Sequence, residues 1–381
     1  MNLRDYMWAY FKLLDLKLHL SLLATVGLCQ TALLIAKNTP PKTYNLLIPT
    51  PYTGGEGDMA ARLEKAAKNI GWDGKTFYYR NEWKLGHLVN FTFDENHLGE
   101  MTLSKLFKIS NPDFIISLYP RKYFLKKIPN YLAMTRGHDE NIRIHGKKLL
   151  QYDGYLCVPQ KMDSFLSFLD QYGKKGNIFE WVPTLLKTEY KPLELKKLFY
   201  CGVNWDPLRT SKTYRNCLRM LDETGLMDVY GTEGMKNWNL KSYKGELPYD
   251  GKSLIKGIKE AGISLVLHSQ EHLDYEVISG RIFEAAAAGA VIISDRHGFV
   301  TREFKDAVLY IDIDKDNKLP ANEMFSQIYT HLIWVLEHPV EAEKLARKAH
   351  SIFSAKFTLE DQLERLGAWH EKLQKELKES R

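Results

Sequence analysis

One segment of the chain, residues 263–295, constrains the fold more than any other. It reads ISLVLHSQEHLDYEVISGRIFEAAAAGAVIISD. Apolar stretches at Ile263–Leu267 and Val291–Ile293 each predict a strand. Between them, Arg281–Ala288 predicts a compact helix that ends at Gly289. In open α/β sheets, ligands bind at the carboxyl ends of the strands, so the polar loop before this helix predicts a binding site.

The predicted helix has small side chains that allow close packing on a sheet and a first turn that could bind a ligand. Ala285–Ala288 carry little side-chain bulk, so the helix can pack close to the strands. Its first turn offers free backbone N–H groups and the positive end of the helix dipole, which would stabilise a phosphate near Ser279, Gly280 and Arg281. Glu284 lies in this turn and could accept hydrogen bonds from sugar hydroxyls. The alternative is a carboxylate that only complements the helix dipole.

A second carboxylate, Glu276, precedes Glu284 with seven residues between them. The run SGRIFEAAAAGAVIISD resembles the nucleotide-binding element of GT-B glycosyltransferases. There, a helix that opens with FEA or LEA and ends in glycine precedes a PVIxSD-like strand. The E-x7-E spacing is similar to that of retaining enzymes in that superfamily. The resemblance implies that Glu284 binds the ribose of a sugar nucleotide and that Glu276 lies near the donor sugar as a catalytic residue.

The resemblance extends beyond the two glutamates, with one departure. The FEAAAAGA–ISD–REF pattern is most similar to the CgeB and spore-protein-like branch of bacterial glycosyltransferases. The glycine-rich run that usually follows the first glutamate is replaced here by Val277–Gly280. The resemblance is therefore more specific for Glu284 than for Glu276.

Chain length, net charge and cysteine usage narrow the possible classes of protein. A chain of 381 residues is too long for one ordinary core and predicts two domains. The net charge of +6 comes without a dominant basic run, so nothing indicates nucleic-acid binding. The four cysteines form no C-x-x-C pair, which predicts neither a zinc site nor a disulfide framework. Cys157 and Cys201 lie in apolar stretches and are predicted as core residues, and this cysteine usage favours the cytoplasm.

The N-terminal segment allows two interpretations. Leu18–Ala36 is largely apolar, but its polar residues disfavour a membrane span. Asp5 and Asp15 disfavour a signal peptide. Residues 1–36 could form a helix that packs on the protein or on a partner subunit. They could also anchor the protein peripherally at the inner face of a membrane. Lys37–Lys42 then predicts a linker.

After this linker, strands alternate with helices, which predicts βαβ units and parallel sheets. Tyr44–Ile48 predicts the first strand and Met59–Ile70 the first helix. Gly54 and Gly55 lie between them, where glycine lets the backbone turn tightly and approach a ligand. The resemblance implies that this loop faces an interdomain cleft near the donor phosphate and the acceptor. The alternative is a plain strand-to-helix turn.

The same pattern restarts in the second half at Leu198–Val203. Arg209 and Lys212 follow this strand and could neutralise a diphosphate, similar to a basic pair in many GT-B enzymes. The alternative is a solvated helix start. The resemblance also places the loops at Gly231 and Tyr249 beside the nucleotide base, where the tyrosine ring could stack.

Histidines offer three further hypotheses. His268 closes a predicted strand and could donate a hydrogen bond to a phosphate or a sugar. A metal pair with His272 is disfavoured because no acidic third ligand is fixed, so no metal and no cofactor besides the donor is predicted. An inverting reaction needs a base, for which His138 and Asp139 are candidates. The E-x7-E spacing favours a retaining reaction, which needs no dedicated protein base.

Together these features predict an α/β protein of GT-B type, with two Rossmann-like domains facing a central cleft. We expect an N-terminal helical segment and linker at 1–42, an acceptor domain at 43–185, a donor domain at 186–360 and a C-terminal helix at 361–381 that crosses back. The expected reaction transfers a sugar from a nucleotide-diphosphate sugar to a hydroxyl of a glycan, lipid or protein, without a metal. A non-catalytic nucleotide or sugar binder and a nucleotide-sugar epimerase are the alternatives.

Overall fold

The computed structural model describes residues 42–51, 54–79, 88–92, 99–102, 111–120, 128–134, 138–158, 160–313 and 319–379. Tyr44–Arg381 forms one compact unit. The predicted N-terminal helix, Leu18–Ala36, lies outside the described residues. None of the described helices combines the length and the apolar character that crossing a membrane requires.

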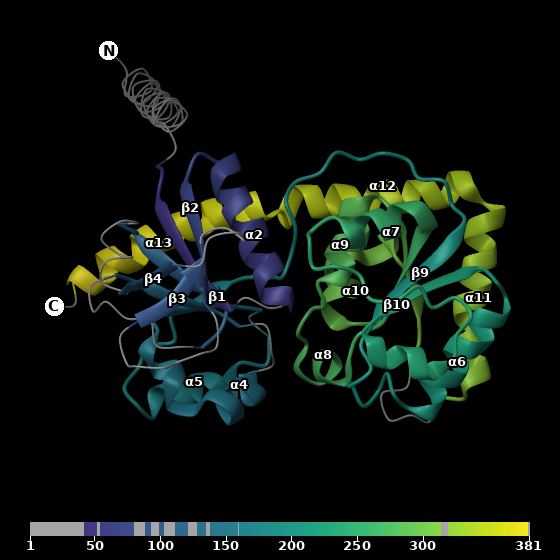
Figure 1. The fold of residues 1–381 in the computed structure, drawn as a ribbon, viewed down its shortest axis with the longest axis horizontal. Coiled ribbons are helices and arrows are strands. Elements are labelled where there is room, and N and C mark those ends of the chain that lie inside the picture. Colours follow the sequence, from purple (N-terminus) through teal and green to yellow (C-terminus); the bar gives the residue numbers. More distant parts are fainter. Residues whose placement is uncertain are drawn as a thin grey trace, which may run out of the picture. The chain divides into compact units, whose positions relative to one another are not determined.

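The first sheet contains eight described strands in the order β4-β3-β2-β1-β5-β6-β7-β8 (Figure 1). Its strands are β1 (Asn45–Pro51), β2 (Asp73–Tyr79), β3 (Leu88–Thr92), β4 (Gly99–Thr102), β5 (Phe114–Ser117), β6 (Asn130–Ala133), β7 (Gly154–Cys157) and β8 (Ile178–Glu180). All neighbouring strands run parallel except for β3, which is antiparallel to both β2 and β4. The central strand β1 is apolar on both faces, since Leu46, Leu47 and Ile48 are all buried, as expected inside a parallel sheet.

The second sheet contains five described strands, all parallel, in the order β10-β9-β11-β12-β13. Its strands are β9 (Lys197–Gly202), β10 (Met227–Gly231), β11 (Gly262–Val266), β12 (Val291–Asp295) and β13 (Leu309–Ile311). A mostly parallel first sheet and a fully parallel second sheet, separated by a connecting segment, confirm the predicted pair of Rossmann-like units.

Helices and 3₁₀ turns connect the strands of both sheets. In the first half they are α2 (Gly54–Asn69), α4 (His138–His145), η1 (Gly146–Gln151) and α5 (Asp163–Asp170). In the second half they are α6 (Lys212–Glu223), η2 (Glu233–Trp238), α7 (Ser253–Ala261), α8 (Gln270–Tyr275), α9 (Arg281–Ala288), α10 (Gly298–Phe304), η3 (Lys305–Ala307), α11 (Ala321–Glu337), α12 (Pro339–Lys356) and α13 (Leu359–Glu379).

Helix α9 has the bounds that the sequence predicts. Every residue from Ile282 to Ala288 is buried, and the helix packs in one core with Val266 of β11 and Ile292 of β12. Gly289 ends the helix with a φ of +79°, a left-handed conformation that glycine adopts without a Cβ clash. Small side chains and a glycine stop therefore place the first turn of α9 at the ligand-binding edge of the sheet.

The last helix, α13, packs on the first half of the chain, against α2 (Figure 1). Leu359, Leu363 and Leu366 share a core with strands β1 and β5. The Tyr131 hydroxyl lies 2.7 Å from Nδ1 of His370. Because α12 packs against α9 of the second half, the C-terminal helices connect both sheets.

Three local predictions were wrong. Helix α2 begins at Gly54 rather than at Met59, since Gly54 takes a φ of +63° at the helix start and the following residues continue helically. The antiparallel strands β3 and β4 were not predicted. The loop between β11 and α9 contains the short helix α8, because the Ser269 hydroxyl caps it by accepting a hydrogen bond from the His272 N–H at 3.2 Å.

Candidate functional site

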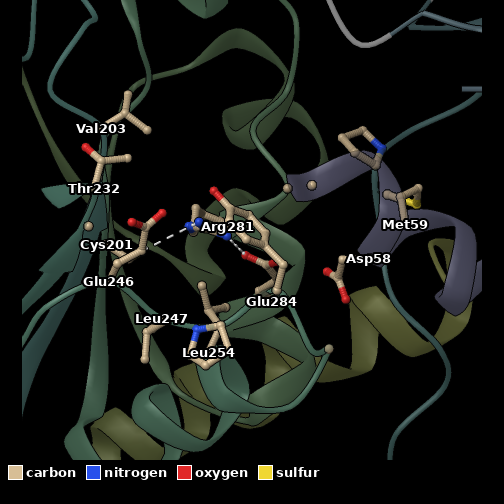
Figure 2. A pocket seen from close by; sticks show the side chains of 18 of the residues that line it. Asp58, Met59, Cys201, Val203, Thr232, Glu246, Leu247, Leu254, Arg281 and Glu284 are labelled. Atoms are coloured by element: carbon tan, nitrogen blue, oxygen red, sulfur yellow. Dashed lines mark hydrogen bonds and ion pairs between the residues drawn. The ribbon is translucent and has the colours of Figure 1, made fainter. Parts of the chain in front are cut away.

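A cavity of about 230 Å³, which we call the central cavity, is lined by residues from both halves of the chain (Figure 2). Helix α2 contributes one wall. The ends of β9 and β10, the loop at 246–251 and the first turn of α9 contribute the other. The cavity thus lies at the carboxyl ends of the strands of the second sheet, where ligands bind in α/β folds.

Glu284 is the main carboxylate of this cavity. Its side chain is 5% exposed and is held by two arginines. The Arg281 guanidinium donates a hydrogen bond to one carboxylate oxygen, and both terminal nitrogens of Arg62 lie 3.3 Å from the other. Burial raises the pKa of Glu284, but the charges of Arg281 and Arg62 outweigh it and the pKa is lowered. Glu284 is therefore an ionised hydrogen-bond acceptor inside the cavity.

Arg62 is shared between two carboxylates. It also pairs with Asp58, one turn earlier on α2, at 2.5 Å. The pKa of Asp58 is nevertheless raised, because burial and the nearby charge of Glu284 outweigh the attraction of Arg62. Arg62 of the first half therefore contacts a carboxylate of each half, Asp58 and Glu284.

Arg281 and Cys201 lie together in the cavity wall (Figure 2). The Arg281 guanidinium donates to Glu284 and lies 3.6 Å from the Cys201 sulfur. Burial lowers the pKa of Arg281, but Glu284 more than offsets this and the pKa is raised. The prediction of Cys201 as a core residue was incomplete, since its half-buried side chain lines the cavity.

The cavity brings together several residues that were predicted to bind a donor. They are Gly231, Tyr249, Gly280, Arg281 and Glu284, and Gly55 of the predicted acceptor and phosphate loop lies with them. Tyr249 is 54% exposed, so its ring is open to a ligand. Gly231 could not carry a side chain, since a Cβ there would lie 2.4 Å from the Gly202 carbonyl oxygen. Gly54 lies next to Gly55 but does not line the cavity. Both glycines belong to the first turn of α2, so the prediction that they form a loop was wrong.

Glu276 does not line the central cavity. It ends α8 in a left-handed conformation, with a φ of +55°. It lines a separate hollow of about 250 Å³ with Arg296 and His297. Its side chain is 38% exposed and lies 3.8 Å from the Lys161 ammonium. The two glutamates of the E-x7-E spacing therefore face different spaces in this structure.

The two residues of the predicted basic pair, Arg209 and Lys212, lie in different environments, and neither lines the central cavity. Arg209 is buried and does not line the central cavity. One of its terminal nitrogens donates to the Leu267 carbonyl at 2.6 Å, and its backbone N–H donates to Asp206. Lys212 is the exposed first residue of α6. Arg209 therefore stabilises the backbone directly after β11 and does not face the central cavity.

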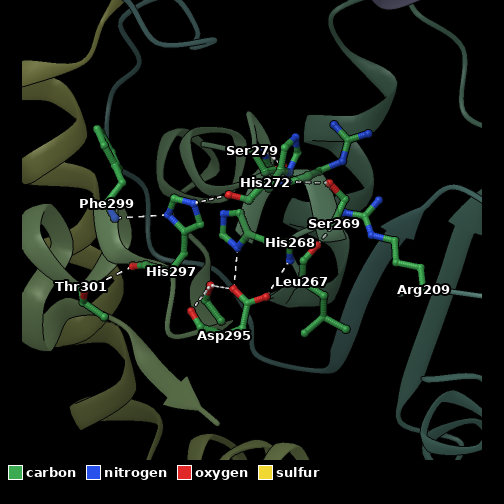
Figure 3. A network of polar contacts seen from close by, with 12 residues as sticks. Arg209, Leu267, His268, Ser269, His272, Ser279, Asp295, His297, Phe299 and Thr301 are labelled. Carbon is green, nitrogen blue, oxygen red and sulfur yellow. Dashed lines mark hydrogen bonds and ion pairs between the residues drawn. The ribbon is translucent and has the colours of Figure 1, made fainter. Parts of the chain in front are cut away.

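His268 is fully buried in a network that we call the histidine cluster, made of His268, His272, Asp295 and His297 (Figure 3). Asp295 accepts a hydrogen bond from the backbone N–H of His268 at 2.7 Å and lies 2.5 Å from its Nδ1. Burial raises the pKa of Asp295, but His268 outweighs it and the pKa is lowered. Asp295 is thus ionised and can only accept, so Nδ1 of His268 carries the proton.

The other histidines of the cluster are held neutral. Burial and the charge of His268 lower the pKa of His297 to about 4 and that of His272 well below its usual value. Nδ1 of His297 accepts from the Phe299 N–H, and Nε2 donates to the His272 carbonyl. The His268 and His297 rings stack at 4.3 Å. Among the described residues, no group of three or more His, Cys, Asp or Glu side chains is arranged to hold a metal ion.

Two further predicted residues, Ser279 and Asp139, lie outside the central cavity. Ser279 is buried, and its hydroxyl accepts from the Arg281 N–H at 3.4 Å, beside the cavity wall. His138 and Asp139 are the first two residues of α4, and Asp139 is exposed. Asp139 does not line the cavity.

Sequence reasoning missed Arg62 and Asp58, which reach the cavity from α2. Their spacing of four residues is a recognisable helical ion pair. Nothing in the local sequence shows that Arg62 also contacts Glu284, which lies 222 residues further along the chain.

Residues 209–368 match the family described as glycosyl transferase-like. This match runs from α6 into the first half of α13 and includes Glu284, and it confirms the glycosyltransferase prediction at the level of the domain class. No curated protein matches the chain in sequence.

Solved structures are similar to almost the whole described fold. The HepE protein of Anabaena is 10% identical with a TM-score of 0.54, and the match covers 85% of this chain and 98% of that one. A sucrose-phosphate synthase of Thermosynechococcus elongatus is 12% identical with a TM-score of 0.53, covering 86% and 98%. The chain spans 61% and 66% of two TarM structures, with TM-scores of 0.49 and 0.48. The chain has the GT-B fold.

Proposed function

We propose that this protein transfers a sugar from a nucleotide-diphosphate sugar to a hydroxyl acceptor. One observation carries the proposal. Glu284, the carboxylate that the GT-B resemblance assigns to a ribose, is buried, ionised and placed in a cavity lined by both halves of the chain. A buried acceptor beside the first turn of a helix suits ribose hydroxyls and a diphosphate together.

Each cavity residue has a role in this proposal. The second half binds the donor. There, Glu284 accepts from the ribose, Arg281 donates to the diphosphate and the exposed ring of Tyr249 stacks on the base. Gly231 and Gly280 let the donor approach the backbone. The HepE structure is described as a complex with UDP-glucose, which makes UDP-sugars the first donors to test.

The first half of the chain supplies the acceptor side and Arg62. The cavity volume of about 230 Å³ is below the roughly 300–1,000 Å³ of typical ligand pockets, and Arg62 occupies one oxygen of Glu284. A ribose that binds Glu284 would displace Arg62, whose planar guanidinium could then pair with the diphosphate. The acceptor would bind on the side of α2, and a CgeB-like enzyme with retention of configuration and no metal remains the specific proposal.

The test is donor turnover by the full chain, measured as nucleotide release from UDP-, GDP-, CDP- and ADP-sugars with and without hydroxyl acceptors. Glu284→Gln keeps the size of the side chain but removes its charge, so we expect kcat/KM to fall about 100-fold, or about 2.7 kcal/mol. Glu343→Gln, at an exposed ion pair on α12, is the matched control and should leave kcat/KM unchanged.

Product analysis separates the alternatives. Acceptor-dependent product with the donor's anomeric configuration kept would support a retaining transferase. Isomerised donor formed without any acceptor would replace the proposal with an epimerase. Saturable nucleotide binding that stabilises the fold, with no turnover of any sugar across an acceptor panel, would replace it with a non-catalytic binder.

A further inference from the structure

A second hollow of about 520 Å³ adjoins the central cavity, and we call it the basic hollow. It is lined by α2, by the connecting segment at 185–188, by one side of α7 with the two residues at 251–252 before it, and by Ala287 of α9. Six cationic side chains surround it against the single carboxylate of Glu260. The cations are Arg62, Lys65, Lys187, Lys252, Lys256 and Lys259.

Most of this positive charge has no counter-charge. Lys256 lies 3.7 Å from Glu260, and Arg62 is occupied in the central cavity. The other four lysines make no ion pair with any residue that the structure describes. By contrast, Lys68 on the next turn of α2 pairs with a carboxylate at 2.6 Å. Like charges gathered around one concave surface raise its potential and attract anions.

The floor of the basic hollow is apolar. Leu185, Leu186, Ile255 and Ala287 line it between the cations. Leu185 and Ala287 are buried, whereas Leu186 and Ile255 are half-buried and remain open to a ligand. Ammonium groups on flexible stems bind phosphate oxygens as point charges, and the apolar floor suits the body that carries the phosphate.

We propose that the basic hollow binds a phosphate-bearing ligand with at least two negative charges on an apolar or sugar body. Arg62 and Gly251 line both spaces, but the five lysines do not line the central cavity. The site is therefore distinct from that of the donor diphosphate, and the proposal does not depend on glycosyl transfer.

The test uses the full chain and titrates inorganic pyrophosphate at fixed ionic strength by calorimetry. The variant Lys65→Gln/Lys187→Gln/Lys259→Gln removes three cations that line only the basic hollow. We expect its affinity to fall about tenfold. The control Lys148→Gln/Lys174→Gln/Lys344→Gln removes the same charge from exposed sites elsewhere and should keep the wild-type affinity.

A gain-of-affinity variant guards against misfolding as an explanation. Glu260→Gln removes the one carboxylate of the hollow and should tighten pyrophosphate binding about twofold to threefold.

Sedimentation with phosphatidic acid vesicles separates the two sources of phosphate. Binding of pyrophosphate alone indicates a soluble ligand, and binding of vesicles alone indicates a lipid, provided that the triple variant loses it. Equal binding by the triple variant and its control, or no binding of either probe, would overturn the proposal.

Discussion

Two buried carboxylates in the second half of the chain differ in what neutralises them. Glu284 is 5% exposed, pairs with two arginines and lines the central cavity. Asp295 is 0% exposed, pairs with His268, accepts a further hydrogen bond from the Ser294 hydroxyl and does not line that cavity. Glu284 can give up Arg62 to a ligand and still be neutralised by Arg281. Asp295 pairs with no arginine or lysine of the described residues, so its network suits a fixed structure better than an exchangeable one.

The contrast teaches how to separate a binding site from a structural network when both are buried and polar. Arginine remains charged at all ordinary pH values, whereas histidine gains and loses its charge near neutrality. The Glu284 network should therefore tolerate changes of pH and respond to ligands. The histidine cluster should respond to pH and to substitution through the stability of the fold.

The largest effect should come from Asp295→Ala. This change leaves the backbone N–H and the ring Nδ1–H of His268 buried without an acceptor. We expect the free energy of unfolding to fall by about 3–5 kcal/mol, measured by urea denaturation. The control is Asp312→Ala, which removes an exposed pair with Arg296 at 2.6 Å and should cost less than about 1 kcal/mol. Equal costs would show that the Asp295 network contributes no more than a surface ion pair.

The next effect is a loss of stability in mild acid. Between pH 6.5 and about 4, an unfolded chain binds a proton at His297 that the folded protein does not, so stability falls as the pH falls through this range. The difference in pKa corresponds to about 3 kcal/mol, and the lowered pKa of His272 acts in the same direction, whereas that of Asp295 adds a loss only near and below pH 3.8. His297→Gln keeps a donor and an acceptor but cannot titrate.

Unfolding free energies measured from pH 7.5 to 4 should thus fall less steeply for His297→Gln than for the wild type. His338→Gln, at an exposed histidine after α11, is the control and should keep the wild-type slope. A wild-type slope in His297→Gln would mean that the loss in acid arises elsewhere.

The same contrast explains which features the sequence could predict. Helix α9 was predicted to the residue because small side chains and a glycine stop are local signals. The alternation of strands and helices predicted parallel α/β sheets, and the resemblance of the run SGRIFEAAAAGAVIISD implied the GT-B arrangement. The contact between Arg62 and Glu284 could not be predicted, since it depends on how two separately folded sheets meet. Burial of Arg209 was missed for the same reason: its loop looks like a solvated helix start until β11 packs beside it.

The smallest effect on stability should come from Gly55→Ala, which tests the cavity side of the comparison. A Cβ at Gly55 meets no atom within 4 Å, and the residue lies in the first turn of α2 on the cavity wall. Alanine should stabilise the helix by about 0.5–1 kcal/mol, while its methyl group takes space from the donor and raises KM several-fold.

Gly54→Ala provides the matched contrast. Its φ of +63° should make it cost about 1–2 kcal/mol, and it does not line the cavity. Gly55→Ala should therefore raise both the thermal unfolding temperature and the donor KM. Gly54→Ala should lower the unfolding temperature and leave the donor KM unchanged. If Gly55→Ala leaves KM unchanged, the donor does not approach α2, and the central cavity belongs to the second half of the chain alone.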